Sequence, residues 1–133
     1  MTLKELLIKH EGKKRKAYLD TEGNWTVGVG RNLEAVDFSD DEIDLMLNND
    51  MKRVLRDCET FPWFIELTPP RQQVVFSMVF NLGLDGFKEF KKMIKAIEKE
   101  DWVEAACQMI DSHWATQVKQ RSVELAVMMK GEA

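Results

Sequence analysis

The sequence is poor in the residues that mark disulfide frameworks, flexible tracts and membrane spans. Its 133 residues include 2 cysteines, 3 prolines and 7 glycines. So few prolines and glycines exclude a disordered or fibrous chain, and two cysteines make neither a disulfide scaffold nor a metal-ligand cluster. No apolar run approaches the roughly 20 residues of a membrane helix. We expect a folded domain without membrane insertion, in which Cys58 and Cys107 are small buried side chains.

Positive charge is also scarce. The chain has 19 Lys and Arg against 23 Asp and Glu, and its net charge is −4. This balance disfavours a basic nucleic-acid binder, so we expect no nucleic-acid partner. It also argues mildly against any other anionic partner, although the basic stretches at 13–16 and 88–95 can compensate over a short range.

A secretory leader is not recognisable either. The first residues, MTLKELLIKHEGKKRK, form a short apolar run broken by charge, without a cleavage site of small residues. The protein is therefore expected to start in the cytoplasm. We also expect it to act as a monomer. Action outside the cell would need a separate route out.

What the sequence does contain is helical periodicity. Leucines at helical spacing predict a first helix over about residues 3–11, with Thr2 and Glu5 as a capping box and Gly12 as the stop. Two short strands, about 16–20 and 24–29, are expected to follow. Their turn, Asp20-Thr21-Glu22-Gly23, makes a hairpin, to which one more short strand can be added.

The second strand of this hairpin has unequal faces. Alternation places Trp25, Val27 and Val29 on one face, and Thr26, Gly28 and Gly30 on the other. The second face is too small to build a core, so something else can lie against its backbone. The alternative is a strand bent by glycines, in which Thr26 serves only strand propensity.

The rest of the chain is predicted to be helical. Ser39 and Glu42 form a capping box for a long helix to about Asp57, with apolar residues on more than one side, as in a helix that runs between two lobes. The remaining predicted helices span about 69–83, 86–98, 101–110 and 112–129. We therefore predict one α+β, mostly helical domain over 1–133. It has an N-terminal lobe at about 1–40, a connecting helix at about 40–57 and a helical C-terminal lobe at about 58–133.

Two carboxylates are candidates for chemistry. Glu11 ends the first helix, where the helix dipole disfavours the charged form and favours the proton that a general acid must hold. Asp20 begins the turn, where a carboxylate stays solvated and ionised. Glycoside hydrolysis needs such a pair. Each residue alone has a plain structural alternative, a surface glutamate and a turn-forming aspartate.

The combination of motifs is more specific. Glu11-Gly12, then Tyr18-x-Asp20-x-x-Gly23, then Thr26-Val27-Gly28-Val29-Gly30 resembles the phage-type lysozymes of glycoside hydrolase family 24 without a gap. The stretches at 77–83, 101–106 and 113–117, the last together with Arg121, are also similar to that family. The resemblance implies a lysozyme-like two-lobe fold.

The resemblance also implies roles for individual residues. Glu11 would be the general acid, while Asp20 and Thr26 would place the attacking water and stabilise the transition state. The bond would be the β-1,4 link between N-acetylmuramic acid and N-acetylglucosamine in bacterial peptidoglycan, cut with inversion and without metal or cofactor. The residues expected to bind substrate are Asn32, Phe80, Asn81, Gly83, Gln117 and Arg121, with Phe90 and Gln108 only approximately aligned. Trp102 and Trp114 are interpreted as core anchors rather than sugar platforms.

Some residues depart from the family pattern. Arg31 stands where many members have His, and Asp50 matches the usual partner of that His, so we predict an Arg31–Asp50 ion pair. His10 stands where an acidic residue is frequent, which changes the surroundings of Arg121. The segment after Asn32 is short, which shortens the expected cleft wall.

Three other functions stay open at this point. The chain could be a non-catalytic peptidoglycan-binding module of the same fold, a lytic transglycosylase, or a helical protein-interaction domain. If it is a muramidase, its expected role is host-cell lysis from the host cytoplasm, with a separate membrane-permeabilising protein to release it. Its expected partner is then the peptidoglycan glycan strand.

Overall fold

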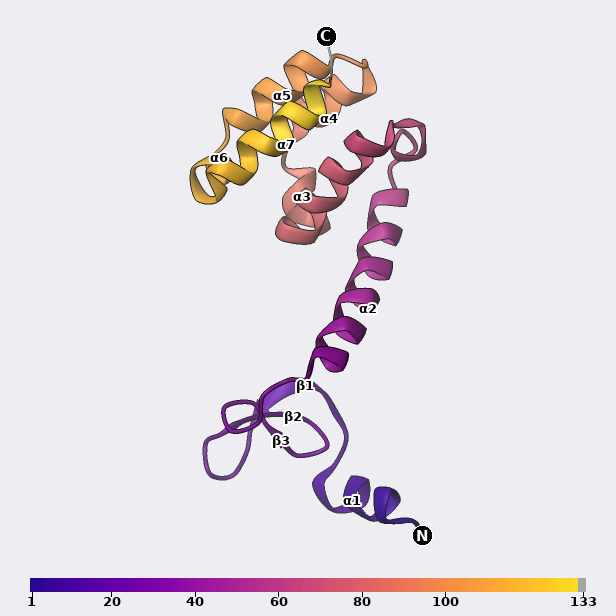
Figure 1. Ribbon diagram of the computed structural model, residues 1–133, viewed down its shortest axis with the longest axis vertical. Helices are drawn as coiled ribbons and strands as arrows, with labels where there is room; N and C mark the ends of the chain where they lie inside the picture. The colour runs from indigo at the N-terminus through magenta and orange to yellow at the C-terminus, as the bar shows by residue number, and fades with distance from the viewer. Residues whose placement is uncertain (132–133) are drawn as a thin grey trace. The chain divides into compact units, whose positions relative to one another are not determined.

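The computed structural model describes residues 1–131, which form two compact units, one over Met1–Leu45 and one that begins at Met46. A small antiparallel sheet near the N-terminus and a predominance of helices make the fold α+β, as predicted (Figure 1). The elements are α1 (Leu3–Glu11), β1 (Lys14–Leu19), β2 (Trp25–Gly28), β3 (Arg31–Asn32), α2 (Asp40–Glu59), the 3-10 turn η1 (Phe64–Glu66), α3 (Pro69–Lys88), α4 (Lys91–Glu98), α5 (Trp102–Ile110), α6 (His113–Val118) and α7 (Gln120–Lys130).

Helix α1 has the predicted ends. The Thr2 hydroxyl accepts from the Glu5 N–H at 3.1 Å, and the Glu5 carboxylate accepts from the Thr2 N–H at 3.3 Å. At the other end Gly12 has φ +79° and donates its N–H to the Ile8 carbonyl at 2.8 Å. The capping box and the glycine stop therefore fix where α1 ends, and so place Glu11 in its last turn.

The sheet has the antiparallel order β1-β2-β3, which includes the third short strand. Thr26 in β2 lies opposite Tyr18 in β1 and Asn32 in β3. The strands differ from the prediction by one or two residues at their ends. The two faces of β2 also differ in burial. Thr26, on the small-residue face, is only 3% exposed, whereas Trp25, on the other face, is 48% exposed. The bulky face of β2 is thus the open one.

Helix α2 begins with the predicted capping box. The Glu42 carboxylate accepts from the Ser39 N–H at 2.8 Å, and the Ser39 hydroxyl accepts from the Glu42 N–H at 3.2 Å. The same carboxylate forms an ion pair with Arg31. The structure thus gives Arg31 a different partner from the expected Asp50, which pairs with Arg53 at 3.1 Å. The capping box fixes Glu42 beside Arg31, and Arg53 lies within one turn of Asp50.

The second unit contains the larger core. Helices α5 and α7 pack side by side, α4 packs on α5, and α3 packs on α7 (Figure 1). Phe87 lies fully buried in this core, with its ring centroid 5.5 Å from that of Phe61 and 6.4 Å from that of Phe90. The other large side chains that are fully or almost fully buried are Val74, Val75, Met78, Val79, Met93, Ile97, Met109 and Met129.

Two of the predicted helices, 86–98 and 112–129, are each divided in the structure. The stretch 86–98 is not one helix, because α3 runs to Lys88 and α4 starts only at Lys91. The stretch 112–129 is also divided, since Lys119 has φ +44° and separates α6 from α7. Its carbonyl accepts from the Ser122 hydroxyl at 2.6 Å and from the Ser122 backbone N–H at 2.9 Å, so it caps the start of α7.

The cysteines and tryptophans are only partly as expected. Cys58 is fully buried, and burial, with the nearby charges of Asp57 and Glu59, raises the pKa of its thiol to about 12. Cys107 is exposed, so the prediction of a buried side chain was wrong for it. Trp114 is buried and Trp102 packs at the core edge, as interpreted. Within residues 1–131 no helix has the length and apolar character needed to cross a membrane.

Candidate functional site

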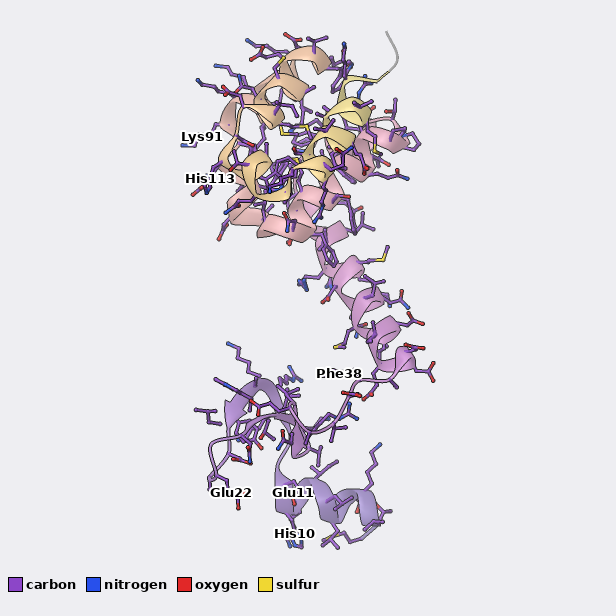
Figure 2. All side chains as sticks on the ribbon, turned by 60° about the vertical axis from the view of Figure 1, so that its left-hand side comes forward. His10, Glu11, Glu22, Phe38, Lys91 and His113 are labelled. Atoms are coloured by element: carbon purple, nitrogen blue, oxygen red, sulfur yellow. The ribbon has the colours of Figure 1, made fainter. Side chains whose placement is uncertain are left out.

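Glu11 lies where the end of α1 meets the sheet (Figure 2). A Cβ built on Gly30, in the turn between β2 and β3, would lie 2.9 Å from the Glu11 Oε2 and 3.3 Å from its Cδ. The carboxyl group therefore rests directly on the backbone of this turn, although the residue as a whole is exposed. One side of the carboxyl group is thus covered by the turn, while the exposure of the residue leaves the rest open to solvent.

Asp20 is fixed by the loop between β1 and β2. Its Oδ1 accepts from the backbone N–H of Glu22 at 2.9 Å and from that of Asn24 at 2.8 Å. Its Oδ2 accepts from the Asn24 side-chain amide at 3.4 Å. Gly23 completes the turn with φ +83° and donates its N–H to the Asp20 carbonyl at 3.0 Å. The carboxylate is thus immobilised mainly through one oxygen.

These hydrogen bonds set the protonation of Asp20. The backbone N–H of Asn24 contributes most to lowering its pKa below the ordinary 3.8, the N–H of Glu22 contributes less, and partial desolvation opposes both. Asp20 is therefore a carboxylate over the whole neutral and mildly acidic range. It can accept a proton or stabilise positive charge there.

Thr26 is joined to the same loop. Its hydroxyl donates to the Asn24 carbonyl at 2.9 Å, and the same carbonyl accepts the Asp20 N–H at 2.9 Å. Since the hydroxyl proton is used, the Thr26 oxygen can only accept hydrogen bonds from a ligand. Thr26 as a whole is only 3% exposed, so little of its surface is open to solvent.

Asn32, the remaining candidate in the first unit, is half-buried in β3. Its side-chain oxygen accepts from the N–H groups of Glu34 at 2.9 Å and Ala35 at 3.1 Å. Its side-chain amide nitrogen is then the group that can donate to a ligand. The structure thus places Glu11, Asp20, Thr26 and Asn32 on one small sheet and its adjoining helix.

The other substrate-binding candidates lie in the second unit. Phe80 and Asn81 are exposed on α3, just before Gly83, where φ +76° bends the helix. The Asn81 side-chain oxygen accepts from the Trp114 indole N–H at 2.9 Å. This bond ties the bend in α3 to α6, and it leaves the Asn81 amide nitrogen free to donate.

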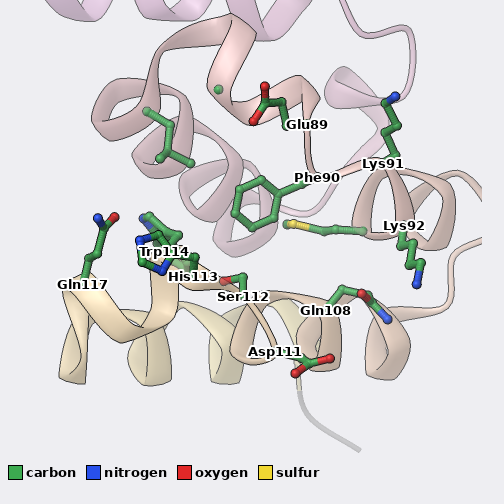
Figure 3. A pocket seen from close by; sticks show the side chains of 13 residues that line it. Glu89, Phe90, Lys91, Lys92, Gln108, Asp111, Ser112, His113, Trp114 and Gln117 are labelled. Carbon is green, nitrogen blue, oxygen red and sulfur yellow. The ribbon is translucent and has the colours of Figure 1, made fainter.

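Gln117 lines a pocket of about 580 Å³ between the end of α3 and helices α4 to α6. Figure 3 shows Gln117 and Trp114 at one end of this pocket and Phe90 and Gln108 along it. Phe90 and Gln108 thus share a cavity with Gln117. Arg121 is exposed on α7 and takes part in none of the ion pairs found among residues 1–131. Within that range, no three His, Cys, Asp or Glu side chains cluster as metal ligands.

Comparison with known proteins gives the family. The phage lysozyme family matches residues 8–128, most of the chain. The chain belongs to this family. It is 31% identical to probable T4-type lysozyme 2 of Dictyostelium discoideum over 91% of this chain and 89% of that protein. Probable T4-type lysozyme 1 of the same organism is 26% identical over the same shares.

A third relative is longer than this lysozyme-family chain. The pre-baseplate central spike protein Gp5 of Enterobacteria phage T4 is 24% identical over 97% of this chain, which corresponds to 28% of the length of Gp5. Membership of the phage lysozyme family makes the chain a lysozyme-like glycosidase. The matched region includes Glu11 at the end of α1 and the whole β-hairpin with Asp20 and Thr26.

Sequence reasoning missed two residues of this lysozyme-like site. Asn24 contacts both Asp20 and Thr26, yet in the sequence it is only the polar residue that follows the turn glycine. An amide side chain four residues after a turn-starting Asp was the available signal. Glu42 was read only as a capping residue, although it also binds Arg31. No local pattern connects residues 11 apart on a strand and a helix.

Proposed function

We propose that the protein hydrolyses the β-1,4 bond between N-acetylmuramic acid and N-acetylglucosamine in bacterial peptidoglycan, with inversion at the anomeric carbon. The observation that carries this proposal is the arrangement on the first unit. The carboxyl group of the exposed residue Glu11 lies against Gly30, and an ionised carboxylate, Asp20, is joined to the Thr26 hydroxyl through Asn24. Family membership supports the class of substrate.

In the proposed reaction, water attacks the anomeric carbon of N-acetylmuramic acid as the bond to the leaving oxygen breaks. Glu11 gives its proton to that oxygen, which becomes a hydroxyl of N-acetylglucosamine. Asp20 takes one proton from the attacking water, so the charges balance. The side chain of Glu11 suits a donor because one of its faces remains open to a bound sugar.

Thr26 gives the water its orientation. Because its hydroxyl already donates to the Asn24 carbonyl, it can only accept a hydrogen from the water, and Asp20 accepts the other. With both hydrogens held, an oxygen lone pair is directed away from the loop, toward the anomeric carbon. This geometry uses a nucleophilic water and supports hydrolysis over internal displacement by the sugar.

The test is product analysis on defined peptidoglycan. Mass spectrometry should find reducing N-acetylmuramic acid ends, and NMR of the first products should find the α-anomer that inversion yields. Glu11→Gln should abolish release while the thermal unfolding midpoint stays near that of the wild type. Anhydro ends would indicate a lytic transglycosylase. Binding to walls without any release would indicate a non-catalytic module, and both results would reject the hydrolase proposal.

Host-cell lysis is a separate part of the proposal. Inside a bacterium the enzyme would be kept from the wall by the membrane, so lysis requires release by a membrane-permeabilising protein. Co-expression with such a protein should clear a culture, and Glu11→Gln in the same strain should not. Clearing by the Gln variant would show that the glycosidase is not what lyses the cell.

A further inference from the structure

Asn24 makes four hydrogen bonds to the candidate catalytic residues Asp20 and Thr26. Its backbone N–H donates to Asp20 Oδ1 at 2.8 Å, and its carbonyl accepts from the Asp20 N–H and from the Thr26 hydroxyl, each at 2.9 Å. Its side-chain amide donates to Asp20 Oδ2 at 3.4 Å. One residue therefore holds both groups that are proposed to bind the attacking water.

The two oxygens of Asp20 are held differently. Oδ1 receives two backbone N–H groups, which any residues except proline at positions 22 and 24 would supply. Oδ2 receives one hydrogen bond from the residues described, and that bond comes from a side chain. Because Oδ1 is saturated by the loop, Oδ2 is the oxygen left for the water. The Asn24 side-chain amide is therefore the described group that holds Oδ2 in place, whereas backbone N–H groups hold Oδ1.

We propose that the side chain of Asn24 is a positioning residue, which orients Oδ2 of Asp20 toward the attacking water. This inference rests on the proposed function. In this proposal the backbone of Asn24 stabilises the loop, and its side chain contributes to the reaction. A purely structural Asn24 would influence stability alone.

Few titratable groups lie near Asp20, so the effect of the Asn24 side chain on the pKa of Asp20 can be measured. Glu22 is the titratable side chain in the same loop, and its contact with Asp20 is through its backbone N–H. Glu11 is the titratable group fixed at the turn between β2 and β3. The groups that lower the pKa of Asp20 are hydrogen-bond donors of residues 22–24, the Asn24 backbone first and its side-chain amide among them. Removal of the amide should therefore raise the pKa of Asp20, and a new carboxylate should raise it further.

Three variants separate the side chain from the backbone. Asn24→Ala keeps both backbone contacts and removes the amide. Asn24→Asp is nearly isosteric and replaces the donor with a second carboxylate, so it also serves if the Ala variant folds poorly. Thr21→Ala is the matched control, because Thr21 is an exposed residue of the same loop.

The first measurement does not depend on activity. The carboxyl carbon of Asp20 is followed by 13C NMR through an acid titration, with thermal unfolding to verify the fold. Asn24→Ala should move the Asp20 midpoint to higher pH, Asn24→Asp should move it more, and Thr21→Ala should leave it in place. An unchanged midpoint in both Asn24 variants would overturn the proposal.

The second measurement uses soluble peptidoglycan glycan fragments. Asn24→Ala should lower kcat about two- to tenfold with little change in KM, as expected for loss of a single hydrogen bond. The acid limb of its pH profile should move to higher pH. A wild-type kcat and pH profile in Asn24→Ala would overturn the role of the side chain. A wild-type protein that releases no product, with the NMR shifts still present, would instead overturn the proposed function.

Discussion

The carboxyl group of Glu11 occupies the space that a side chain on Gly30 would fill, since a Cβ there would lie 2.9 Å from Oε2. Gly30 also has φ +66°, which non-glycine residues rarely adopt. A glycine is therefore required at this position for two reasons: the turn needs a positive φ, and Glu11 lies where a side chain would be. The second requirement links the end of α1 to the sheet.

Gly30→Ala should therefore inactivate the enzyme. The new methyl group must displace the Glu11 carboxyl group, and a small displacement of a proton donor can reduce the rate about a hundredfold. The positive φ should also lower the free energy of unfolding by about 1 kcal/mol or more. Glycan release and urea unfolding measure the two effects separately.

Gly28→Ala is the matched control for this prediction. Gly28 has φ +67°, almost the same as Gly30, but a Cβ there would have no atom within 4 Å. We expect a similar loss of stability with most of the activity kept. If Gly28→Ala lost as much activity as Gly30→Ala, backbone strain rather than the displacement of Glu11 would be the cause.

The sequence predicted elements whose ends carry local signals. The capping box of Thr2 and Glu5, that of Ser39 and Glu42, and the Gly12 stop all lie where they were expected, because each depends on residues within four positions. The break at Lys119 was missed. A lysine with positive φ has no sequence signature, because L-residues with a side chain rarely adopt this conformation.

The candidate site was predicted as a set of residues, not as a network. Glu11, Asp20 and Thr26 were identified by motif, and the structure adds how they are held. The contact of Glu11 with Gly30 and the pairing of Arg31 with Glu42 join separate elements, so single-residue patterns cannot reveal them. The burial of Thr26 beside an open Trp25 likewise depends on packing, because alternation identifies two faces without saying which is covered.

The Arg31–Glu42 pair should make stability depend on pH. The Ser39 backbone N–H first, and the Arg31 guanidinium further, hold the pKa of Glu42 below its ordinary 4.5. Such a group stabilises the fold above its unfolded-state pKa, and this contribution is lost as pH falls through the folded-state value. Glu42→Gln should lower Tm at pH 7 by on the order of a few degrees or less. The difference from the wild type should shrink below pH 4.5.

Calorimetry would measure the Tm difference between the wild type and Glu42→Gln. It should cover roughly pH 2.5–7, the range over which carboxylates titrate. Glu34→Gln, at an exposed residue outside the ion pairs of the described chain, is the control and should show no such trend. A Tm difference between wild type and Glu42→Gln that stays constant with pH would contradict the role of the charge.

The two cysteines should differ in reactivity. Cys107 is exposed, whereas Cys58 is fully buried and its thiol has a pKa raised to about 12. Because the thiolate is the reactive form, a disulfide reagent at pH 8 should modify one thiol in the folded protein and both in urea. Cys107→Ser should remove the native reaction. Fast modification of Cys58 in that variant would mean that its surroundings open readily.

Phe87 should be a main source of stability in the second unit. It is fully buried and contacts the rings of Phe61 and Phe90. Phe87→Ala should lower the free energy of unfolding by about 3–5 kcal/mol, and Phe87→Leu by less, because a smaller cavity remains. Val127→Ala, on the exposed side of α7, should change it by about 0.5 kcal/mol or less. Urea unfolding curves of the three variants would rank these effects.

The bond between Trp114 and Asn81 gives a test of substrate binding in the second unit. The buried indole N–H occupies the Asn81 side-chain oxygen at 2.9 Å, so the amide nitrogen is the group that can donate to a sugar. Asn81→Asp keeps an oxygen for Trp114 and removes that donor. It should raise KM about two- to tenfold with little loss of stability.

Trp114→Phe makes the complementary change. It removes the indole donor and keeps an aromatic ring, so it should lower stability by about 1–2 kcal/mol through the unpaired Asn81 oxygen and the smaller ring. Its KM should also rise, because Asn81 is no longer held. KM from initial rates on glycan fragments, with unfolding curves for both variants, separates the two roles of Asn81. A normal KM in Asn81→Asp would show that this amide does not contact the sugar.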